Sequence, residues 1–175
     1  TAQHKEELYF PFKRYHISKV WRGEKPQAGR YREFVQCDFD TVGSDSAVSD
    51  FETLSLMKAA LSAIGVDEIK IHVNHRGIFN RFLKKLGLSE KSEDILRAVD
   101  KIAKVGEEKV SAELEEITGN ADSSAKIIDY IKPLSSFEET LSHIEELAGG
   151  EDEDSKRMKT IFSMMKAAGI EGTYM

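Results

Sequence analysis

The chain has 175 residues, of which 40% are hydrophobic and 32% charged, and its formal net charge is −6. Domains typically hold about 100–200 residues, so this length indicates one domain, or one core with an appended lobe. The acidic, mixed charge excludes a strongly basic nucleic-acid-binding module as the first interpretation. A single cysteine, Cys37, excludes an internal disulfide and a cysteine-rich metal site.

Location and completeness can also be addressed from the sequence. No apolar run approaches the roughly 20 residues that span a bilayer, and no signal-peptide pattern stands at the start. A single cysteine is typical of a reducing compartment, so we expect a cytoplasmic protein without membrane association. The sequence starts at Thr1 without a methionine and stops at Met175 without a change of composition. We therefore expect it to be part of a longer protein.

The first predicted elements are two strands joined by a long loop. Residues 13–22 alternate in character with period two, which is typical of a strand. The stretch 23–29 contains glycine and proline and cannot continue a central strand. Residues 31–42 are predicted to return as the second strand of a hairpin.

The same alternation predicts two different faces for the returning strand. Val35, Cys37 and Phe39 share one face, which we expect to turn towards helices. The other face is mostly polar and carries Arg32, Phe34, Gln36, Asp38 and Asp40. We expect Arg22 of the first strand to lie on this second face.

Helices dominate the rest of the prediction. A capping box at Ser49 starts a helix that should run to about Ile64, and residues 69–73 alternate as a short strand. From Gly77 to Leu147 the apolar spacing is helical almost throughout, which indicates a small helical lobe. Acidic residues 151–154 are expected to form a solvated linker and to place negative charge at the start of a last helix, 155–168.

Charge is uneven within the helical lobe. Residues 75–105 hold eight lysines and arginines against four acids, a net +4. Residues 107–155 hold fifteen acids against three lysines, a net −12. The two halves therefore cannot contact a charged partner in the same way.

The hairpin gathers side chains that suit a ligand. Its loop and one strand face bring together arginines, a ring, an amide and carboxylates: Arg22, Glu24, Arg30, Arg32, Phe34, Gln36 and Asp40. Arginine offers a fork of donors to phosphate oxygens, and a ring can stack on a base for about 1–3 kcal/mol. Gln36 and Asp40 can bind a cationic or hydrogen-bonding group. A salt-bridged outer face is the alternative.

Residues 22–40, RGEKPQAGRYREFVQCDFD, resemble motif 2 of class II aminoacyl-tRNA synthetases. The class pattern is Arg-x-Glu, a loop and Arg-x-x-x-Phe, and the stretch from Glu24 to Gln36 resembles the form specific to histidyl-tRNA synthetases. The resemblance implies an α+β fold in which an antiparallel sheet is backed by helices. It also implies that 1–74 and 155–175 belong to the catalytic core and 75–154 to a helical insertion.

Site residues follow from the resemblance position by position. Arg22 is similar to the arginine that holds the α-phosphate of ATP and the carboxylate of histidine, and it is the expected catalytic residue. The ATP-binding positions match Arg22, Glu24, Arg30, Tyr31 and Phe34, with Phe34 stacking on adenine. The histidine-binding positions match Arg22, Gln36 and Asp40.

The resemblance also implies substrates and partners. These are histidine, ATP with Mg²⁺ and tRNA(His), with a homodimer for the full-length enzyme and no metal held by the protein itself. The five histidines are scattered and lack metal-ligand spacing. Because RNA attracts lysine and arginine, we expect the basic half of the lobe to face tRNA, with Arg81, Lys84 and Lys85 as contacts.

Parts of the family pattern are missing from the chain. Motif 1, motif 3 and the histidine-reading segment are not found, so we expect the chain to be inactive by itself. One alternative is the catalytically silent paralogue that serves as a regulatory subunit of histidine biosynthesis; the retained Glu24, Arg30 and Phe34 argue against it. Another is a non-catalytic helical interaction domain, against which an intact motif 2 argues.

Overall fold

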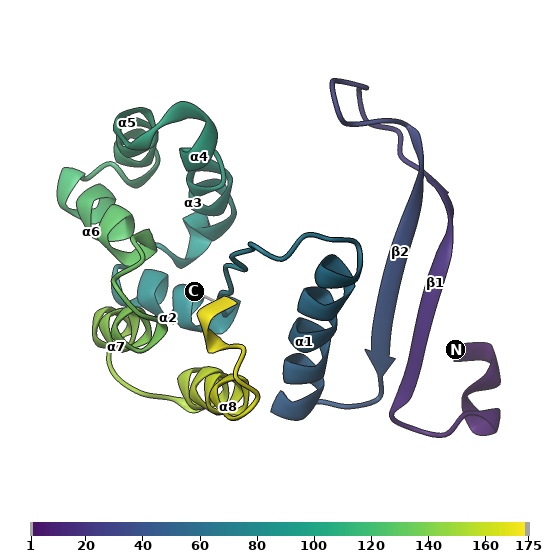
Figure 1. Cartoon of the computed structure of the whole chain (residues 1–175). Helices are drawn as coiled ribbons and strands as arrows, with labels where there is room; N and C mark the ends of the chain where they lie inside the picture. Colours follow the sequence, from purple (N-terminus) through teal and green to yellow (C-terminus); the bar gives the residue numbers. More distant parts are fainter. Residues whose placement is uncertain (1, 174–175) are drawn as a thin grey trace. The chain divides into compact units, whose positions relative to one another are not determined.

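The computed structural model describes residues 2–173 and divides the chain into two compact units, Thr1–Asp67 and Glu68–Met175 (Figure 1). The first unit contains a 3₁₀ turn, η1 (Ala2–Glu7), a hairpin of β1 (Phe12–Trp21) and β2 (Glu33–Val42), and helix α1 (Ala47–Ala63). The second unit is helical. The division places the segment after residue 154 with the helices, and its assignment to a catalytic core stays a prediction.

The predicted hairpin is confirmed. β1 and β2 pair antiparallel in one unbroken register that runs from Phe12 opposite Val42 to Trp21 opposite Glu33. Arg22 extends the ladder, because its N–H donates to the carbonyl of Arg32 at 2.8 Å. The α+β class expected from the sequence therefore stands, with the antiparallel sheet and a helix in one unit.

The expected covering of one sheet face is wrong for two of its three residues. Val35 is 64% exposed and Cys37 is exposed, whereas Phe39 is half-buried. Helix α1 contacts the end of the hairpin that lies away from the loop, where Lys13 Nζ is 2.7 Å from an oxygen of Glu52. One helix therefore covers only the end of β2 at which Phe39 lies, and the face around Val35 lacks a covering layer in the described residues.

Two further local predictions need correction. Helix α1 begins at Ala47, because the Ser46 side chain accepts from the Val48 N–H at 3.2 Å before Ser49 can act as the cap. Residues 69–73 form no strand; the Ile71 N–H donates to the Thr173 carbonyl at 2.8 Å, a single bridge. Alternation predicts which side chains could share a sheet face, but a strand also needs a neighbour along its length.

The helical lobe is confirmed and holds the core. Its helices are α2 (Arg76–Lys85), α3 (Ser92–Val99), α4 (Ile102–Val105), α5 (Glu107–Thr118), α6 (Ala121–Ile131), α7 (Phe137–Ala148) and α8 (Glu153–Ala167), with 3₁₀ turns η2 (Ser89–Lys91) and η3 (Glu171–Thr173). Among the described residues, every fully buried apolar side chain belongs to this unit, for example Ile78, Ile95 and Leu114.

The start of α8 follows ordinary capping chemistry. The acidic stretch at 151–154 is more than a linker, because Asp152 and Ser155 form a reciprocal capping box at the start of α8. Two acids in the first turn then oppose the positive end of the helix dipole, as the sequence predicts. The cap Asp152 also lies 3.3 Å from Nη1 of Arg81, which joins α8 to α2.

Candidate functional site

The conformation of Arg22 is set by two neighbours across the hairpin. Its Nη2 donates to Oε1 of Gln36 at 3.3 Å, and its guanidinium carbon lies 5.0 Å from the centre of the Phe34 ring. Phe34 and Gln36 are half-buried. The predicted sharing of one face by these three side chains is thus confirmed. A cation held over a ring leaves the other guanidinium donors to meet an anion.

Asp40 lies on the same face, further along β2. It stands four residues beyond Gln36, which corresponds to about 13 Å along a strand. Its partner in the register is Arg14, and the two side chains form an ion pair. Arg14 also lies 3.3 Å from Oδ2 of Asp38. The face therefore has a cationic and aromatic end at Arg22 and an acidic end at Asp40.

The loop between the strands is polar and exposed. A two-hydrogen-bond bridge between Gln27 and Arg30 closes its tip, with N···O distances of 3.1 and 2.8 Å. Arg30 Nη1 lies 3.3 Å from a carboxylate oxygen of Glu24, and Arg32 Nε donates to the Glu24 carbonyl at 3.2 Å. Glu24 therefore brings the two loop arginines together, while Tyr31 beside them is 68% exposed.

The three basic residues predicted to contact RNA have different environments. Arg81 is paired with Asp152, and Lys85 Nζ donates to the carbonyls of Glu146 and Leu147 at 3.3 and 3.0 Å. Lys85 thus donates to two carbonyls at the end of α7, where a positive charge is favoured. Lys84 is exposed. Two of the three cations therefore bind partners inside the lobe.

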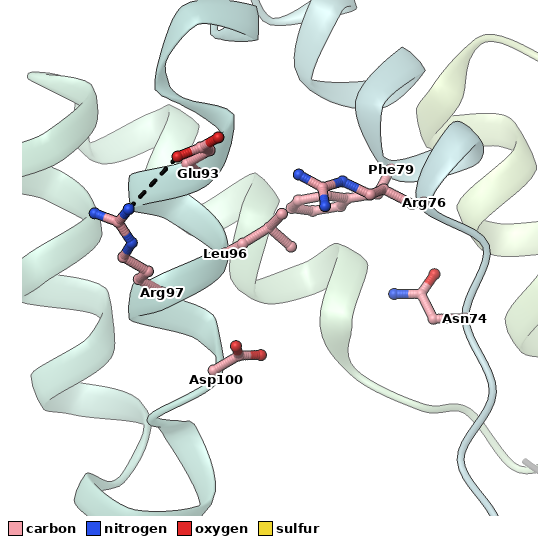
Figure 2. A pocket seen from close by; sticks show the side chains of 7 residues that line it. All are labelled: Asn74, Arg76, Phe79, Glu93, Leu96, Arg97 and Asp100. Carbon is pink, nitrogen blue, oxygen red and sulfur yellow. Dashed lines mark hydrogen bonds and ion pairs between the residues drawn. The ribbon is translucent and has the colours of Figure 1, made fainter. Parts of the chain in front are cut away.

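Sequence reasoning did not single out a pocket of about 440 Å³ in the helical unit. Figure 2 shows its lining: Asn74, Arg76, Phe79, Glu93, Leu96, Arg97 and Asp100. Arg97 Nη2 lies 3.5 Å from a Glu93 oxygen, whereas Arg76 carries an exposed guanidinium. Both arginines belong to the basic half of the lobe. The charge asymmetry was the signal that pointed to this region, but it could not single out the pocket.

Neither a metal cluster nor a membrane-spanning helix occurs in residues 2–173. Within them, no group of three or more histidine, cysteine, aspartate or glutamate side chains could hold a metal ion. No helix of the same residues is both long and apolar enough to cross a membrane.

The antiparallel hairpin with Arg22, Phe34 and Gln36 on one face is the arrangement expected of a class II aminoacyl-tRNA synthetase, and comparison with known proteins identifies the family. The profile of the histidyl-tRNA synthetase family matches residues 1–172. The chain therefore belongs to the histidyl-tRNA synthetase family.

Individual relatives agree with this assignment. A histidine–tRNA ligase of Treponema denticola is 62% identical over 98% of this chain and 39% of its own length. That of Treponema pallidum strain Nichols is 49% identical over 99% of the chain and 40% of its own length. The crystal structure of histidyl-tRNA synthetase from Nostoc sp. PCC 7120 matches with a TM-score of 0.85 at 28% identity, covering 99% of this chain and 41% of that one. The chain spans about two fifths of these relatives.

Proposed function

We propose that this chain is the part of a histidine–tRNA ligase that binds ATP and histidine on the hairpin and contacts tRNA through the helical lobe. The observation that carries the proposal is the Arg22, Phe34 and Gln36 arrangement, in which a guanidinium is fixed over a ring and beside an amide. In the family reaction, ATP activates histidine to histidyl-adenylate, which then passes the amino acid to tRNA(His).

Activation needs positioning and charge neutralisation more than acid–base chemistry. A carboxylate oxygen of histidine attacks the α-phosphorus of ATP, a new P–O bond forms, and the bond to pyrophosphate breaks. Arg22 would hold the α-phosphate and the attacking carboxylate together, and its fork can neutralise the charge that builds up between them. It is the residue to which we assign the catalytic role.

The other residues proposed to bind ATP and those proposed to bind histidine lie in different parts of the hairpin. Phe34 would stack on adenine, with Glu24, Arg30 and Tyr31 of the loop around the nucleotide. Gln36 and Asp40 would bind the histidine substrate, because their acceptors lie on the same face beyond Arg22. Mg²⁺ would neutralise the ATP phosphates. We further propose a cytoplasmic, homodimeric full-length enzyme, in which residues 1–74 and 155–175 are part of the catalytic core and residues 75–154 form an insertion.

The test of this proposal is pyrophosphate exchange by the full-length synthetase that contains this segment. Exchange of labelled pyrophosphate into ATP should depend on histidine and on no other amino acid. The 175-residue chain alone should not form the adenylate, because motif 3 and the histidine-reading segment are not in it. Exchange that runs equally well without histidine would overturn the proposal.

We expect tRNA affinity to depend on the exposed cations of the basic half. Arg76, Lys84 and Lys104 are exposed, and their side chains form no ion pair or hydrogen bond among residues 2–173, so neutralising them should leave the lobe folded. In the full-length enzyme, the triple change to glutamine should weaken tRNA binding. It should also flatten the salt dependence by about one unit of slope for each phosphate that the enzyme no longer neutralises.

The matched control is on the acidic half. Glu108, Glu115 and Glu116 are also exposed, and their side chains have no ion-pair partner in the described part of the chain. Their change to glutamine should leave tRNA affinity unchanged or slightly increased. If the acidic triple variant weakens binding while the basic one does not, the basic half does not face the RNA.

A further inference from the structure

The acidic end of the hairpin face carries a charged cluster that the family resemblance does not explain. Arg14 stands opposite Asp40 in the register, and His16 stands opposite Asp38. The Arg14 Nη2 contacts Oδ2 of Asp40 and donates to Oδ2 of Asp38 at 3.3 Å. The His16 Nδ1 lies 3.5 Å from the other oxygen of Asp38. One guanidinium therefore bridges two carboxylates of the same strand.

The bridge has a clear electrostatic reason. Asp38 and Asp40 are two residues apart on one strand, so their α-carbons are about 7 Å apart and both side chains leave the same face. Two negative groups at this distance repel each other, and the Arg14 cation offsets that repulsion. Arg14 and Asp40 are 42% and 45% exposed, and ion pairs as exposed as this one contribute little to folding stability.

We propose that Arg14 is a positioning residue for Asp40, which it holds in the orientation that receives the histidine substrate. This inference rests on the proposed histidine-binding role of Asp40. The contact with Arg14 is made by Oδ2, so the acceptor sites of Oδ1 remain for a donor such as an imidazole N–H. Without Arg14, the Asp40 side chain is free to rotate and is repelled by Asp38.

The test compares steady-state kinetics of the full-length synthetase with Arg14→Met and a matched control. Arg14→Met should raise the KM for histidine about tenfold, a size typical of coupling between contacting charged groups. The KM for ATP should stay unchanged, since Arg22 and Phe34 lie at the other end of the face. Arg14→Lys should restore part of the affinity, because lysine keeps the charge but lacks the fork.

The control replaces a similar cation on the opposite face of the same strand. Lys19 Nζ lies 2.7 Å from Oε1 of Glu33, and its side chain is 63% exposed. Lys19→Met should leave both KM values unchanged. If a cross-strand ion pair affected the KM for histidine only through the stability of the hairpin, Lys19→Met and Arg14→Met would raise it equally.

Asp40→Asn separates the inference from the proposal on which it rests. If Asp40→Asn raises the histidine KM and Arg14→Met raises it no further in that background, Arg14 acts through Asp40. If Asp40→Asn raises the KM and Arg14→Met in the wild-type background does not, the positioning role of Arg14 is wrong and the role of Asp40 stands. If Asp40→Asn has no effect, the proposed role of Asp40 fails and the inference fails with it.

Discussion

Replacing Arg22 with alanine should reduce histidine-dependent pyrophosphate exchange by the full-length enzyme about 100- to 1000-fold. Loss of one fixed donor to a developing negative charge typically costs about 3–4 kcal/mol of transition-state stabilisation. Arg22 is held for this role by the Gln36 amide at 3.3 Å and the Phe34 ring at 5.0 Å. The measurement is kcat/KM for histidine in the exchange assay.

A nearby cation in the loop that follows Arg22 supplies the control. Lys25 is exposed, and its side chain forms no ion pair or hydrogen bond with the other described residues. Lys25→Ala should therefore change the exchange rate little. Arg22→Lys should give an intermediate rate, because the ammonium keeps the charge without the two-pronged geometry. Near-normal exchange by Arg22→Ala would remove Arg22 from the catalytic step.

Replacing Phe82 with alanine should destabilise the helical unit by about 3–5 kcal/mol, the usual cost of removing a buried aromatic ring. Phe82 is 1% exposed and stacks on the Tyr130 ring, with centroids 4.6 Å apart and planes 18° apart. The measurement is urea unfolding followed by far-ultraviolet circular dichroism. In the same helix, Lys84→Ala should change the free energy of unfolding by less than about 0.5 kcal/mol.

A substitution in the partner ring, Tyr130, should not lower the free energy of unfolding. The Tyr130 hydroxyl is buried and has no hydrogen-bond partner among the described residues, and burial raises the pKa of Tyr130. Tyr130→Phe keeps the ring contact and removes the unsatisfied group, so it should leave stability unchanged or increase it. If Phe82→Ala costs less than about 1 kcal/mol, the two rings do not form the centre of this core.

Local patterns predicted much of the hairpin because strand alternation depends on neighbours in the sequence. The shared face of Arg22, Phe34 and Gln36 followed from period two and from a loop that fixes the register. Exposure of the opposite face did not follow, because it depends on which element covers Val35. The same alternation predicts Arg14 on the face of Arg22, and the register confirms it by pairing Arg14 with Asp40.

Long-range partners account for what the sequence could not predict. Lys85 binds carbonyls about sixty residues away, and Arg81 pairs with a helix cap about seventy residues away. Helical spacing indicated that these side chains could share a surface, but it held no information about Asp152 or the end of α7. The same limit applies to Ile71, whose backbone bridge is with Thr173.

The division of the hairpin face into a nucleotide end and a histidine end can be tested by the KM values of two variants of the full-length enzyme. Phe34→Leu keeps an apolar side chain and removes the ring, so it should raise the KM for ATP about tenfold, within the range of about 1–3 kcal/mol for base stacking. Asp40→Asn should raise the KM for histidine and leave that for ATP unchanged. If each variant raises both KM values equally, or if the two effects are exchanged, the hairpin face does not bind its ligands as proposed.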